Sequence, residues 1–556
     1  MILATPEQIK EYTEKAWWRE KTLLDYFQEN ARENSQRVAV VDPYDKEELT
    51  GFSAERVTYG ELERAADAMA TSFLEVGIRK DDIVMVQLPN CWELAMLYLA
   101  ITKAGALISP VPLQWRKKEI QYIAKLTGAK AVITVENFHG FNHKEMIEEI
   151  MLELPEIEYI FTLNEIKQKT KGNINKEKLD SVEVDANDIF TLCWTSGTEA
   201  EPKGCPLSHN NWINQGLLQV DTADIKTGDV QLTAGPLVNM ASVGTTFIPW
   251  LILGGTLVLH HPFNPQLFIQ QMMQEKVNYT LLVPAVGNMI VKHPQVDRFD
   301  LSSVRAITMG SAPPSLFTIQ EFKRRWDIEI GNVWGQNEGT GIVSGPKDVP
   351  DLSKRVDHLP QFGKNDAVWA ADITKRLQTK LVDPETGKEV RDVGDVGELA
   401  YRGPNLMPGY FKRPELNSKA FDEEGFFYTG DLFVIKENNY IGFFERKKDI
   451  IIRGGFNISA QEIENVLFGH PKLADMAAIA MPDEVLGERT CIYVVPKGDE
   501  KITLDEFTSF LKEKGMAVYK LPERLEIVET IPRNPVGKIM KSVLREDLKK
   551  KMQSGS

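Results

Sequence analysis

The sequence predicts a large α/β protein with a largely parallel sheet, followed by a β subdomain and a small α+β domain. In the first two-thirds of the chain, short apolar segments alternate with segments whose apolar residues recur at helical spacing. From about residue 360 the chain becomes rich in Gly, Pro and charge, with short strands that are typical of an antiparallel sheet. The 556 residues, 42% of them apolar, suffice for several domains.

The elements of the first part follow one another as helix and strand. Residues 56–77 predict an amphipathic helix that ends at Gly77, and residues 91–106 predict a second, buried helix. Short buried strands are expected at residues 81–89, 129–135, 188–194, 279–284 and 304–310. A ligand of such a sheet is expected at the carboxyl ends of the strands.

The last part, from Asp449, predicts a self-contained α+β domain with strands at 449–453, 474–482, 491–496 and 524–529. One helix is expected from Ser459 and another from Thr503. Ser459 and Glu462 fit the S-x-x-E pattern, in which the serine oxygen accepts from an exposed helix N–H and the glutamate accepts from the serine N–H.

Composition limits the function. The formal charge of −15 argues against a nucleic-acid or anionic-membrane partner, because such partners attract a basic face. Four cysteines without C-x-x-C or metal-ligand spacing indicate reduced thiols and a cytoplasmic protein. The most apolar run, residues 247–259, is broken by Pro249 and two glycines, so we expect a buried helix and strand and no membrane span.

The segment TSGTEAEPKG, from Thr195 to Gly204, combines hydroxyl side chains with a lysine. It is neither a G-x-x-x-x-G-K-[ST] loop nor a G-x-G-x-x-G loop. It follows an apolar strand and precedes a segment that is helical from about Ser208, so its hydroxyls and Lys203 could hold phosphate oxygens. Ser, Thr, Gly and Pro also form ordinary surface turns, and the residues alone leave both interpretations open.

A second cluster lies at two further strand ends, GSAP at 310–313 and WGQNE at 334–338. Trp334 could stack on a flat ring, Gly335 allows close backbone approach, and Glu338 could hold magnesium beside phosphates. Taken alone, the same residues are typical of a core aromatic beside a solvated carboxylate.

Two further motifs carry charge in the last third. In YTGD, Asp431 could accept the hydroxyls of a ribose diol, and Arg446 could complete that clamp. Lys538 follows a Pro-x-Gly bend in RNPVGKIMK, which could hold it on a rigid loop. A hairpin turn and a solvated lysine are the ordinary alternatives.

The ordered set TSGT-x3-PKG, GSAP, WGQNE, YTGD, ERKKDIIIRGG and NPVGK spans nearly the whole chain. In this order and spacing it resembles the adenylate-forming superfamily of acyl-CoA synthetases, peptide-synthetase adenylation domains and firefly luciferase. VTYGEL, LMPGYFKRPE and GFFYTGDL make the chain most similar to a stand-alone acid–CoA ligase. The resemblance implies a large N-terminal AMP-binding domain of stacked α/β sheets with a β subdomain over residues 1–447, and a small, mobile α+β C-terminal domain over residues 448–556.

The resemblance implies a role for each matching position. The implied catalytic residues are Lys203, Glu338 and Lys538, with Glu338 and Thr198 as magnesium ligands. The implied ATP and AMP contacts are Thr195, Ser196, Gly197, Thr198, Lys203, Gly310, Ser311, Ala312, Trp334, Gly335, Gln336, Asn337, Asp431, Arg446 and Lys538. The implied acyl pocket contains Asn239, Met240, Val243, Gly310, Gly339 and Ile342, and the implied hinge and CoA positions are Lys448, Gly454 and Gly455.

The chain departs from the family pattern at a few positions. Glu199-Ala200-Glu201 replaces the usual Gly of the phosphate loop, Asn239 stands where relatives often have His, and Asn337 replaces the usual Thr. The implied acyl pocket has no Lys or Arg to meet a second carboxylate, so we expect a medium-chain, branched, alicyclic or aryl monocarboxylic acid.

The expected function is therefore an AMP-forming ligase that uses ATP, Mg²⁺ and CoA to activate a carboxylic acid in the cytoplasm. A stand-alone adenylation enzyme that loads a separate carrier protein is the nearest alternative. A non-catalytic nucleotide-binding protein is the alternative from another class, motivated by the two loop carboxylates and Asn239. The retained Lys203, Glu338, Asp431 and Lys538 argue against it, and whether the protein forms a homodimer stays open.

Overall fold

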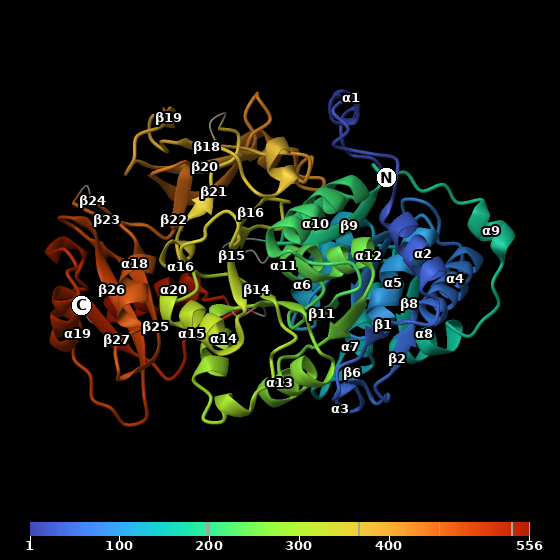
Figure 1. Cartoon of the computed structure of the whole chain (residues 1–556), viewed down its shortest axis with the longest axis horizontal. Helices are drawn as coiled ribbons and strands as arrows, with labels where there is room; N and C mark the ends of the chain where they lie inside the picture. Colours follow the sequence, from blue (N-terminus) through green and yellow to red (C-terminus); the bar gives the residue numbers. More distant parts are fainter. Residues whose placement is uncertain (196–200, 365–366, 455, 535–537, 555–556) are drawn as a thin grey trace. The chain divides into compact units, whose positions relative to one another are not determined.

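The chain folds into two units, as the computed structural model shows for residues 1–195, 201–364, 367–454, 456–534 and 538–554. One unit contains residues 1–195, 201–378 and 402–419, and the other contains residues 379–401 and the chain from residue 420 (Figure 1). The mixed α/β structure, with a large N-terminal part built on sheets and a C-terminal domain, confirms the predicted fold class. The boundary between residues 447 and 448 stays a prediction.

An eight-stranded sheet forms the centre of the first unit, in the order β16-β15-β14-β13-β11-β12-β1-β2. Its strands are β1 (Val38–Val41), β2 (Arg56–Thr58), β11 (Val230–Thr233), β12 (Thr256–Leu259), β13 (Tyr279–Leu282), β14 (Ala306–Gly310), β15 (Glu329–Gly335) and β16 (Gly341–Ser344). All neighbours pair in parallel except the two edge strands, β2 and β16. The largely parallel arrangement confirms the expectation from alternating helices and strands.

A six-stranded sheet, ordered β10-β9-β4-β3-β5-β8, is the second layer of this unit. Its strands are β3 (Ile83–Gln87), β4 (Leu107–Pro110), β5 (Ala131–Thr134), β8 (Tyr159–Thr162), β9 (Ile189–Trp194) and β10 (Gly204–Ser208). Only β10 runs antiparallel, against β9. The strand predictions at 81–89, 129–135 and 188–194 are confirmed.

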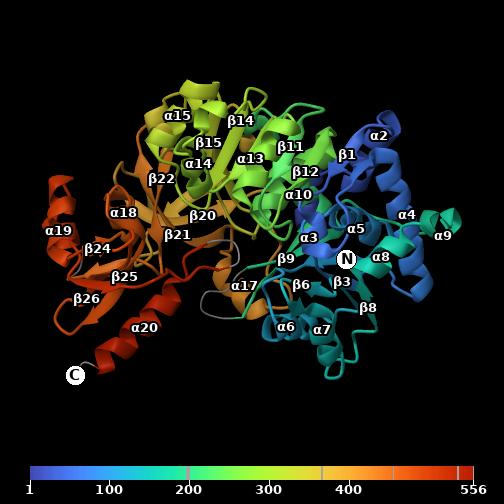
Figure 2. The same cartoon turned by 90° about the horizontal axis from the view of Figure 1, so that it is seen from below.

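Helices cover both sheets. α5 (Trp92–Lys103) contacts β1 and β4, and α10 (His209–Ala223) contacts β10 and β14, so both lie between the sheets. α13 (Pro265–Gln274), α14 (Pro284–Val291) and α15 (Leu316–Trp326) share a buried apolar cluster with strands of the eight-stranded sheet. α6 (Lys117–Thr127) and α7 (His143–Met151) do the same for the six-stranded sheet, as Figure 2 shows.

Two local predictions about helices can be checked directly. α4 (Tyr59–Val76) ends at Gly77, whose φ of 98° is left-handed and explains the glycine. The run 247–259 forms the end of a π-helical turn, η1 (Val243–Phe247), then α12 (Ile248–Leu253) and β12. Within the described residues, no helix has both the length and the apolarity needed to cross a bilayer.

The second unit begins with the expected antiparallel sheet, whose strands within this unit follow the order β22-β21-β20-β18-β19. They are β18 (Gln378–Val382), β19 (Glu389–Val390), β20 (Val396–Arg402), β21 (Phe427–Lys436) and β22 (Tyr440–Arg446). α17 (Pro414–Ala420), which precedes β21 in the chain, belongs to the first unit except for its last residue.

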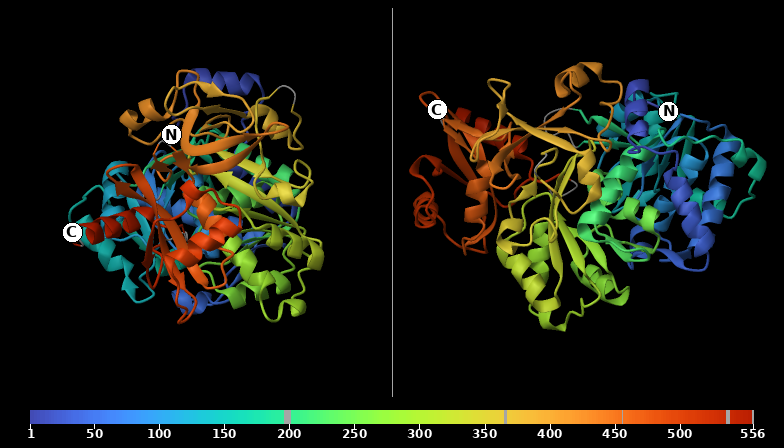
Figure 3. Two further views of the ribbon diagram at one scale, coloured as in Figure 1. Left: turned by 90° about the vertical axis from the view of Figure 1, so that its left-hand side faces the viewer. Right: turned by 45° about the horizontal axis from the view of Figure 1, so that its top comes forward.

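The last part is an α+β layer structure (Figure 3). β23 (Ile451–Arg453), β24 (Phe456–Ile458), β25 (Leu473–Asp483), β26 (Gly487–Pro496) and β27 (Arg524–Ile527) form its sheet. α18 (Ala460–Leu467) and α19 (Leu504–Glu513) share one apolar cluster with the strands, and α20 (Lys541–Ser554) shares another.

The start of α18 agrees only partly with the S-x-x-E prediction. Ser459 accepts from the N–H of Glu462 at 3.1 Å, as expected. The Glu462 carboxylate instead lies 2.7 Å from the ammonium of Lys520. The glutamate that the capping pattern assigns to the helix start therefore forms an ion pair with Lys520 instead.

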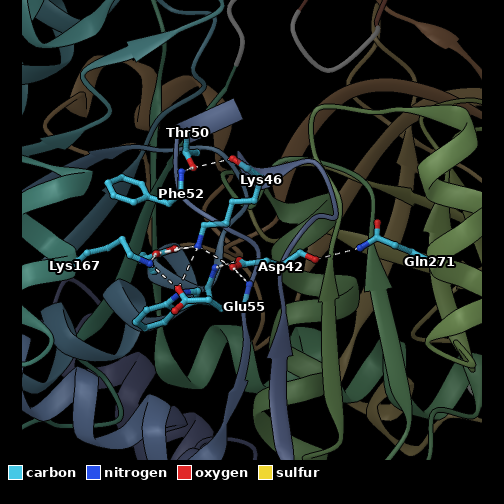
Figure 4. Close-up of polar contacts among 9 residues, drawn as sticks. Asp42, Lys46, Thr50, Phe52, Glu55, Lys167 and Gln271 are labelled. Carbon is cyan, nitrogen blue, oxygen red and sulfur yellow. Dashed lines mark hydrogen bonds and ion pairs between the residues drawn. The ribbon is translucent and has the colours of Figure 1, made fainter. Parts of the chain in front are cut away.

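Charged side chains from separate segments of the first unit form one largely buried cluster (Figure 4). Lys46 is 1% exposed, and its ammonium lies 2.7 Å from the carboxylate of Asp42 and 2.8 Å from that of Glu93. Lys167 bonds to the carboxylates of Glu93 and Glu55. Because Asp42 and Glu93 are fully buried, their charges depend on these lysines for compensation.

Candidate active site

The carboxyl ends of parallel strands bring the second group of predicted residues to one edge of the eight-stranded sheet. Gly310 ends β14 beside Val333 of β15, and Trp334 and Gly335 end β15. A Cβ atom at residue 310 would lie 2.8 Å from Cγ1 of Val333, so the strand pairing requires glycine there. Ser311, with a left-handed φ of 72°, and Ala312 follow as exposed residues.

Asn337 connects three segments at this edge. Its side-chain nitrogen donates to the carbonyl of Trp194 at the end of β9, at 2.8 Å. Its side-chain oxygen accepts from the N–H of Met240 at 2.9 Å. The amide replaces the family's threonine and can donate and accept at once, so it holds the ends of two sheets and the next helix start in fixed positions.

The segment from Thr195 to Lys203 lies between the antiparallel strands β9 and β10, and β10 separates it from α10. The N–H of Thr195 donates to the carbonyl of Lys203 at 3.0 Å, and the N–H of Lys203 donates to Oγ1 of Thr195 at 3.3 Å. The predicted strand-to-helix loop is thus a hairpin connection, although α10 does begin after Ser208 as expected. Ser196, Gly197 and Thr198 lie outside the described residues.

Lys203 and Glu338 are brought together through a tyrosine. The ammonium of Lys203 lies 2.9 Å from the hydroxyl of Tyr410, and that hydroxyl lies 2.8 Å from Oε1 of Glu338. Glu338 is only 7% exposed. Burial, together with the negative charge of Glu338, raises the pKa of Tyr410, so its hydroxyl stays protonated and donates to the carboxylate.

Glu338 also fits the requirements of a magnesium ligand. Among the described residues, no three His, Cys, Asp or Glu side chains form a metal-binding group. Mg²⁺ does not need such a group, because it is commonly held by one or two carboxylates together with substrate phosphates and water. A single buried carboxylate beside an ammonium therefore matches a magnesium–nucleotide site better than an all-protein metal site.

The ribose candidates are neighbours in the second unit. Asp431 of β21 pairs with Arg446 of β22, and Nε of the arginine lies 3.8 Å from the aspartate. Asp431 is 4% exposed, while the arginine side chain is 28% exposed. The N–H of Asp431 donates to Oγ1 of Thr429, which stabilises the turn before it.

The structure also describes most of the remaining candidates of the second unit. Lys538 and Asn534 exchange two hydrogen bonds of 2.8 Å, and residues 535–537 lie outside the described residues. Lys448 is exposed, and its carbonyl accepts from Arg545 at 3.3 Å. Gly454 has a left-handed φ of 56°, whereas Gly455 lies outside the described residues.

The acyl-pocket candidates follow β11 and lie along β16. Met240, Val243 and Ile342 are buried, and Asn239 caps the short helix α11 (Met240–Ser242) by accepting from the N–H of Ser242. A Cβ at residue 339 would lie 2.2 Å from the carbonyl oxygen of Asn405, so Gly339 is needed for this approach.

Sequence reasoning missed three residues at these positions. Gln215 and Asn405 are hydrogen-bonded at 3.0 Å, and Gln215 lies against Gly341. Tyr410 belongs to the motif LMPGYFKRPE, from which no role for it follows. Its position directly after Gly409 in a family motif was the available signal; nothing in the local pattern shows that it faces residues 72 and 207 positions away.

Comparisons with known proteins find relatives over nearly the whole chain. Residues 27–411 match the family model "AMP-binding enzyme", and residues 462–538 match "AMP-binding enzyme C-terminal domain". The chain is 32% identical to a medium-chain fatty-acid–CoA ligase of Escherichia coli, covering 97% of this chain and 93% of that protein. It is 29% identical to a 2,3-dihydroxybenzoate-AMP ligase of Bacillus subtilis, covering 99% and 98%. The structure resembles that of ATP-bound MatB from Rhodopseudomonas palustris, with a TM-score of 0.81, 25% identity and coverage of 95% and 99%.

Proposed function

The chain belongs to the AMP-binding enzyme family of the adenylate-forming superfamily, and we propose that it is an ATP-dependent carboxylic acid–CoA ligase. Adenylate-forming acid ligases attach AMP to a carboxylic acid. In the proposed reaction, the carboxylate attacks the α-phosphorus of ATP and diphosphate leaves. The CoA thiol then attacks the acyl-adenylate, AMP leaves, and acyl-CoA is formed.

The observation that carries this proposal is the arrangement of Lys203, Tyr410 and Glu338. It places an ammonium and a buried carboxylate on either side of one hydroxyl group. Both substrates of the first step are anions, so catalysis depends on charge neutralisation and positioning. An ammonium for phosphate oxygens beside a carboxylate for Mg²⁺ meets that need in a protein whose net charge is −15.

Different residues of the chain would bind different parts of the nucleotide. Lys203 binds phosphate oxygens, Trp334 stacks on the adenine, and Asp431 with Arg446 binds the ribose hydroxyls. Lys538 offsets the negative charges of the substrate carboxylate and the α-phosphate as these two groups approach each other. Glu338 would hold Mg²⁺, which, when bound, offsets the charge of the phosphates.

The remaining assignments complete the proposed site. Gly310, Ser311, Ala312, Gly335, Gln336 and Asn337 supply further nucleotide contacts, as do Thr195, Ser196, Gly197 and Thr198. Lys448 is the proposed hinge, and Gly454 and Gly455 allow the pantetheine arm to pass close to the backbone.

The acid is proposed to be a monocarboxylic acid with an apolar body. Met240, Val243 and Ile342 are buried apolar side chains of the proposed acyl pocket. The neighbouring pair of Gln215 and Asn405 would allow one polar substituent. The similarity to the E. coli medium-chain fatty-acid–CoA ligase supports a chain of medium length.

A second candidate function is the loading of a separate carrier protein. The 29% identity to the 2,3-dihydroxybenzoate-AMP ligase, over almost the full length of both chains, is the observation that favours it. The two functions share the first half-reaction and differ only in the thiol acceptor.

The test measures acid-dependent exchange of diphosphate into ATP over a panel of monocarboxylic acids, and then AMP release with CoA or with phosphopantetheinylated carrier proteins. We expect exchange with at least one acid and AMP release that requires CoA. Release with a carrier protein alone would favour the second function. Exchange with no acid at all would contradict both functions and support a non-catalytic nucleotide-binding protein.

A further inference from the structure

We propose that Tyr410 is a positioning residue that holds the Lys203 ammonium and the Glu338 carboxylate at a fixed separation for magnesium–ATP. This inference rests on the proposed function, and it adds a specific task for a residue outside the phosphate loop. Tyr410 acts through its two partners, so the inference concerns how Lys203 and Glu338 are held.

The directions of the two hydrogen bonds follow from chemistry. An ammonium can only donate, and an ionised carboxylate can only accept. The hydroxyl of Tyr410 therefore accepts from Lys203 at 2.9 Å and donates to Glu338 at 2.8 Å. A phenol keeps its proton near neutral pH, so the hydroxyl can make both bonds at once.

The aromatic ring also restrains the lysine. The ammonium of Lys203 lies 4.2 Å from the ring centre of Tyr410, within the range of a cation–π contact. A lysine has a flexible four-carbon stem, and without such restraints its ammonium would sample many positions. The ring and the hydroxyl together select one position.

Backbone bonds fix Tyr410 relative to both partners. The N–H of Phe411 donates to the carbonyl of Gly204, which directly follows Lys203, at 2.9 Å. The N–H of Met407 donates to the carbonyl of Glu338 at 2.9 Å. The segment that carries Tyr410 is thus attached to the segments of both residues that its hydroxyl contacts.

A side chain also holds the tyrosine backbone. The side-chain oxygen of Asn417 accepts from the N–H of Tyr410 at 2.7 Å, and its nitrogen donates to the Tyr410 carbonyl at 3.3 Å. Such support means that the hydroxyl keeps its position when its two partners exchange contacts with a nucleotide. Preorganised groups of this kind need no rearrangement during the reaction.

The test replaces Tyr410 with phenylalanine, which removes the hydroxyl and keeps the ring. Loss of hydrogen bonds to charged groups predicts a ~10- to 100-fold decrease in kcat/KM for magnesium–ATP in the adenylation step. Calorimetry without acid should show weaker magnesium–ATP binding by Tyr410→Phe. Formation of acyl-CoA from supplied acyl-adenylate, which needs neither ATP nor Mg²⁺, should be unchanged.

The matched control is Tyr59→Phe. Tyr59 is also buried, and its hydroxyl donates to the carbonyl of Gly255 at 3.1 Å, so the same chemical change is made outside the site. This variant should keep wild-type magnesium–ATP binding. A double variant, Tyr410→Phe with Lys203→Ala, should weaken magnesium–ATP binding by less than the sum of the two single effects, because part of the effect of the hydroxyl passes through Lys203.

The outcomes separate this inference from the proposed function. If the wild-type protein adenylates an acid and Tyr410→Phe matches it within twofold in both binding and kcat/KM, the inference is wrong and the function stands. Full additivity of the two substitutions would also overturn it. If the wild-type protein adenylates no acid, the proposed function fails, and the calorimetric comparison still decides the role of Tyr410.

Discussion

Replacing Lys46 with methionine should destabilise the first unit strongly. Methionine keeps most of the side-chain volume but removes the charge that faces Asp42 at 2.7 Å and Glu93 at 2.8 Å. Both carboxylates are fully buried, so water cannot replace the ammonium without local opening of the fold. Breaking a buried ion pair by removing one partner costs ~3–5 kcal/mol.

Two features of the cluster set the size of this effect. Burial raises the pKa of Asp42 to about 6, and the charge of Lys46 acts in the opposite direction. Without Lys46, Asp42 should therefore be protonated in the folded state at a higher pH, which relieves part of the cost. Lys167 still bonds to Glu93 at 3.1 Å, so that carboxylate keeps one cation.

The assay is urea-induced unfolding followed by tryptophan fluorescence, with Lys10→Met as the control. Lys10 is 75% exposed and lies 3.9 Å from Glu14, and exposed pairs of this kind contribute ~0–1 kcal/mol. Lys46→Met should lower the urea midpoint far more than the control. Equal midpoints for the two variants would refute the view that the buried charges are compensated mainly by Lys46.

Further predictions concern the site and the pH dependence. Lys538→Ala should slow adenylation by ~10²-fold or more, because it removes a preorganised donor. Formation of acyl-CoA from supplied acyl-adenylate should stay intact. Equal losses in both half-reactions would contradict the proposed role of Lys538. Glu338→Gln should raise the Mg²⁺ concentration needed for half-maximal ATP use, and an unchanged Mg²⁺ dependence would indicate another ligand. Burial lowers the pKa of His209 to about 4, so the unfolded chain binds a proton below about pH 6.5 that the folded chain takes up only near pH 4. This difference removes about 3 kcal/mol of stability as the pH falls across that range. His209→Gln should reduce the number of protons taken up on unfolding by about one, so the unfolding free energy should decrease less steeply as the pH falls. An identical pH profile for the two proteins would show that His209 is not responsible.

The apolar strands could be predicted because buried strands appear in the sequence as continuous runs of apolar residues. Residues 81–89, 129–135 and 304–310 each contain β-branched or other large apolar side chains between turn residues, and each forms a parallel strand. The end of α4 could be predicted because only glycine adopts the left-handed conformation of Gly77 readily.

β10 could not be predicted with the same means. Its sequence, GCPLS, contains Gly204 and Pro206, which are both unfavourable in strands. It pairs only with β9 at the edge of the sheet, where a proline is tolerated. The tertiary pairing therefore overrides the local preference and turns the predicted strand-to-helix loop into a hairpin.

The site was predicted as a set of motifs, whereas its connections were not. Motif order selects Lys203, Glu338 and Asn337 as candidates, but no local pattern shows that the hydroxyl of Tyr410 contacts the first two. The two hydrogen bonds of Asn337 also reach residues that are 97 and 143 positions away. Contacts over such distances depend on the packing of the sheets, which a pattern of neighbouring residues does not encode.

The most direct measurement is mass spectrometry of the products formed from ATP, Mg²⁺, CoA and a panel of monocarboxylic acids by the wild-type protein. The proposed function predicts one acyl-CoA, with AMP in equal amount, and no acyl-CoA when ATP or the acid is left out. The appearance of acyl-adenylate without any thioester, at saturating CoA, would contradict the assignment as a CoA ligase.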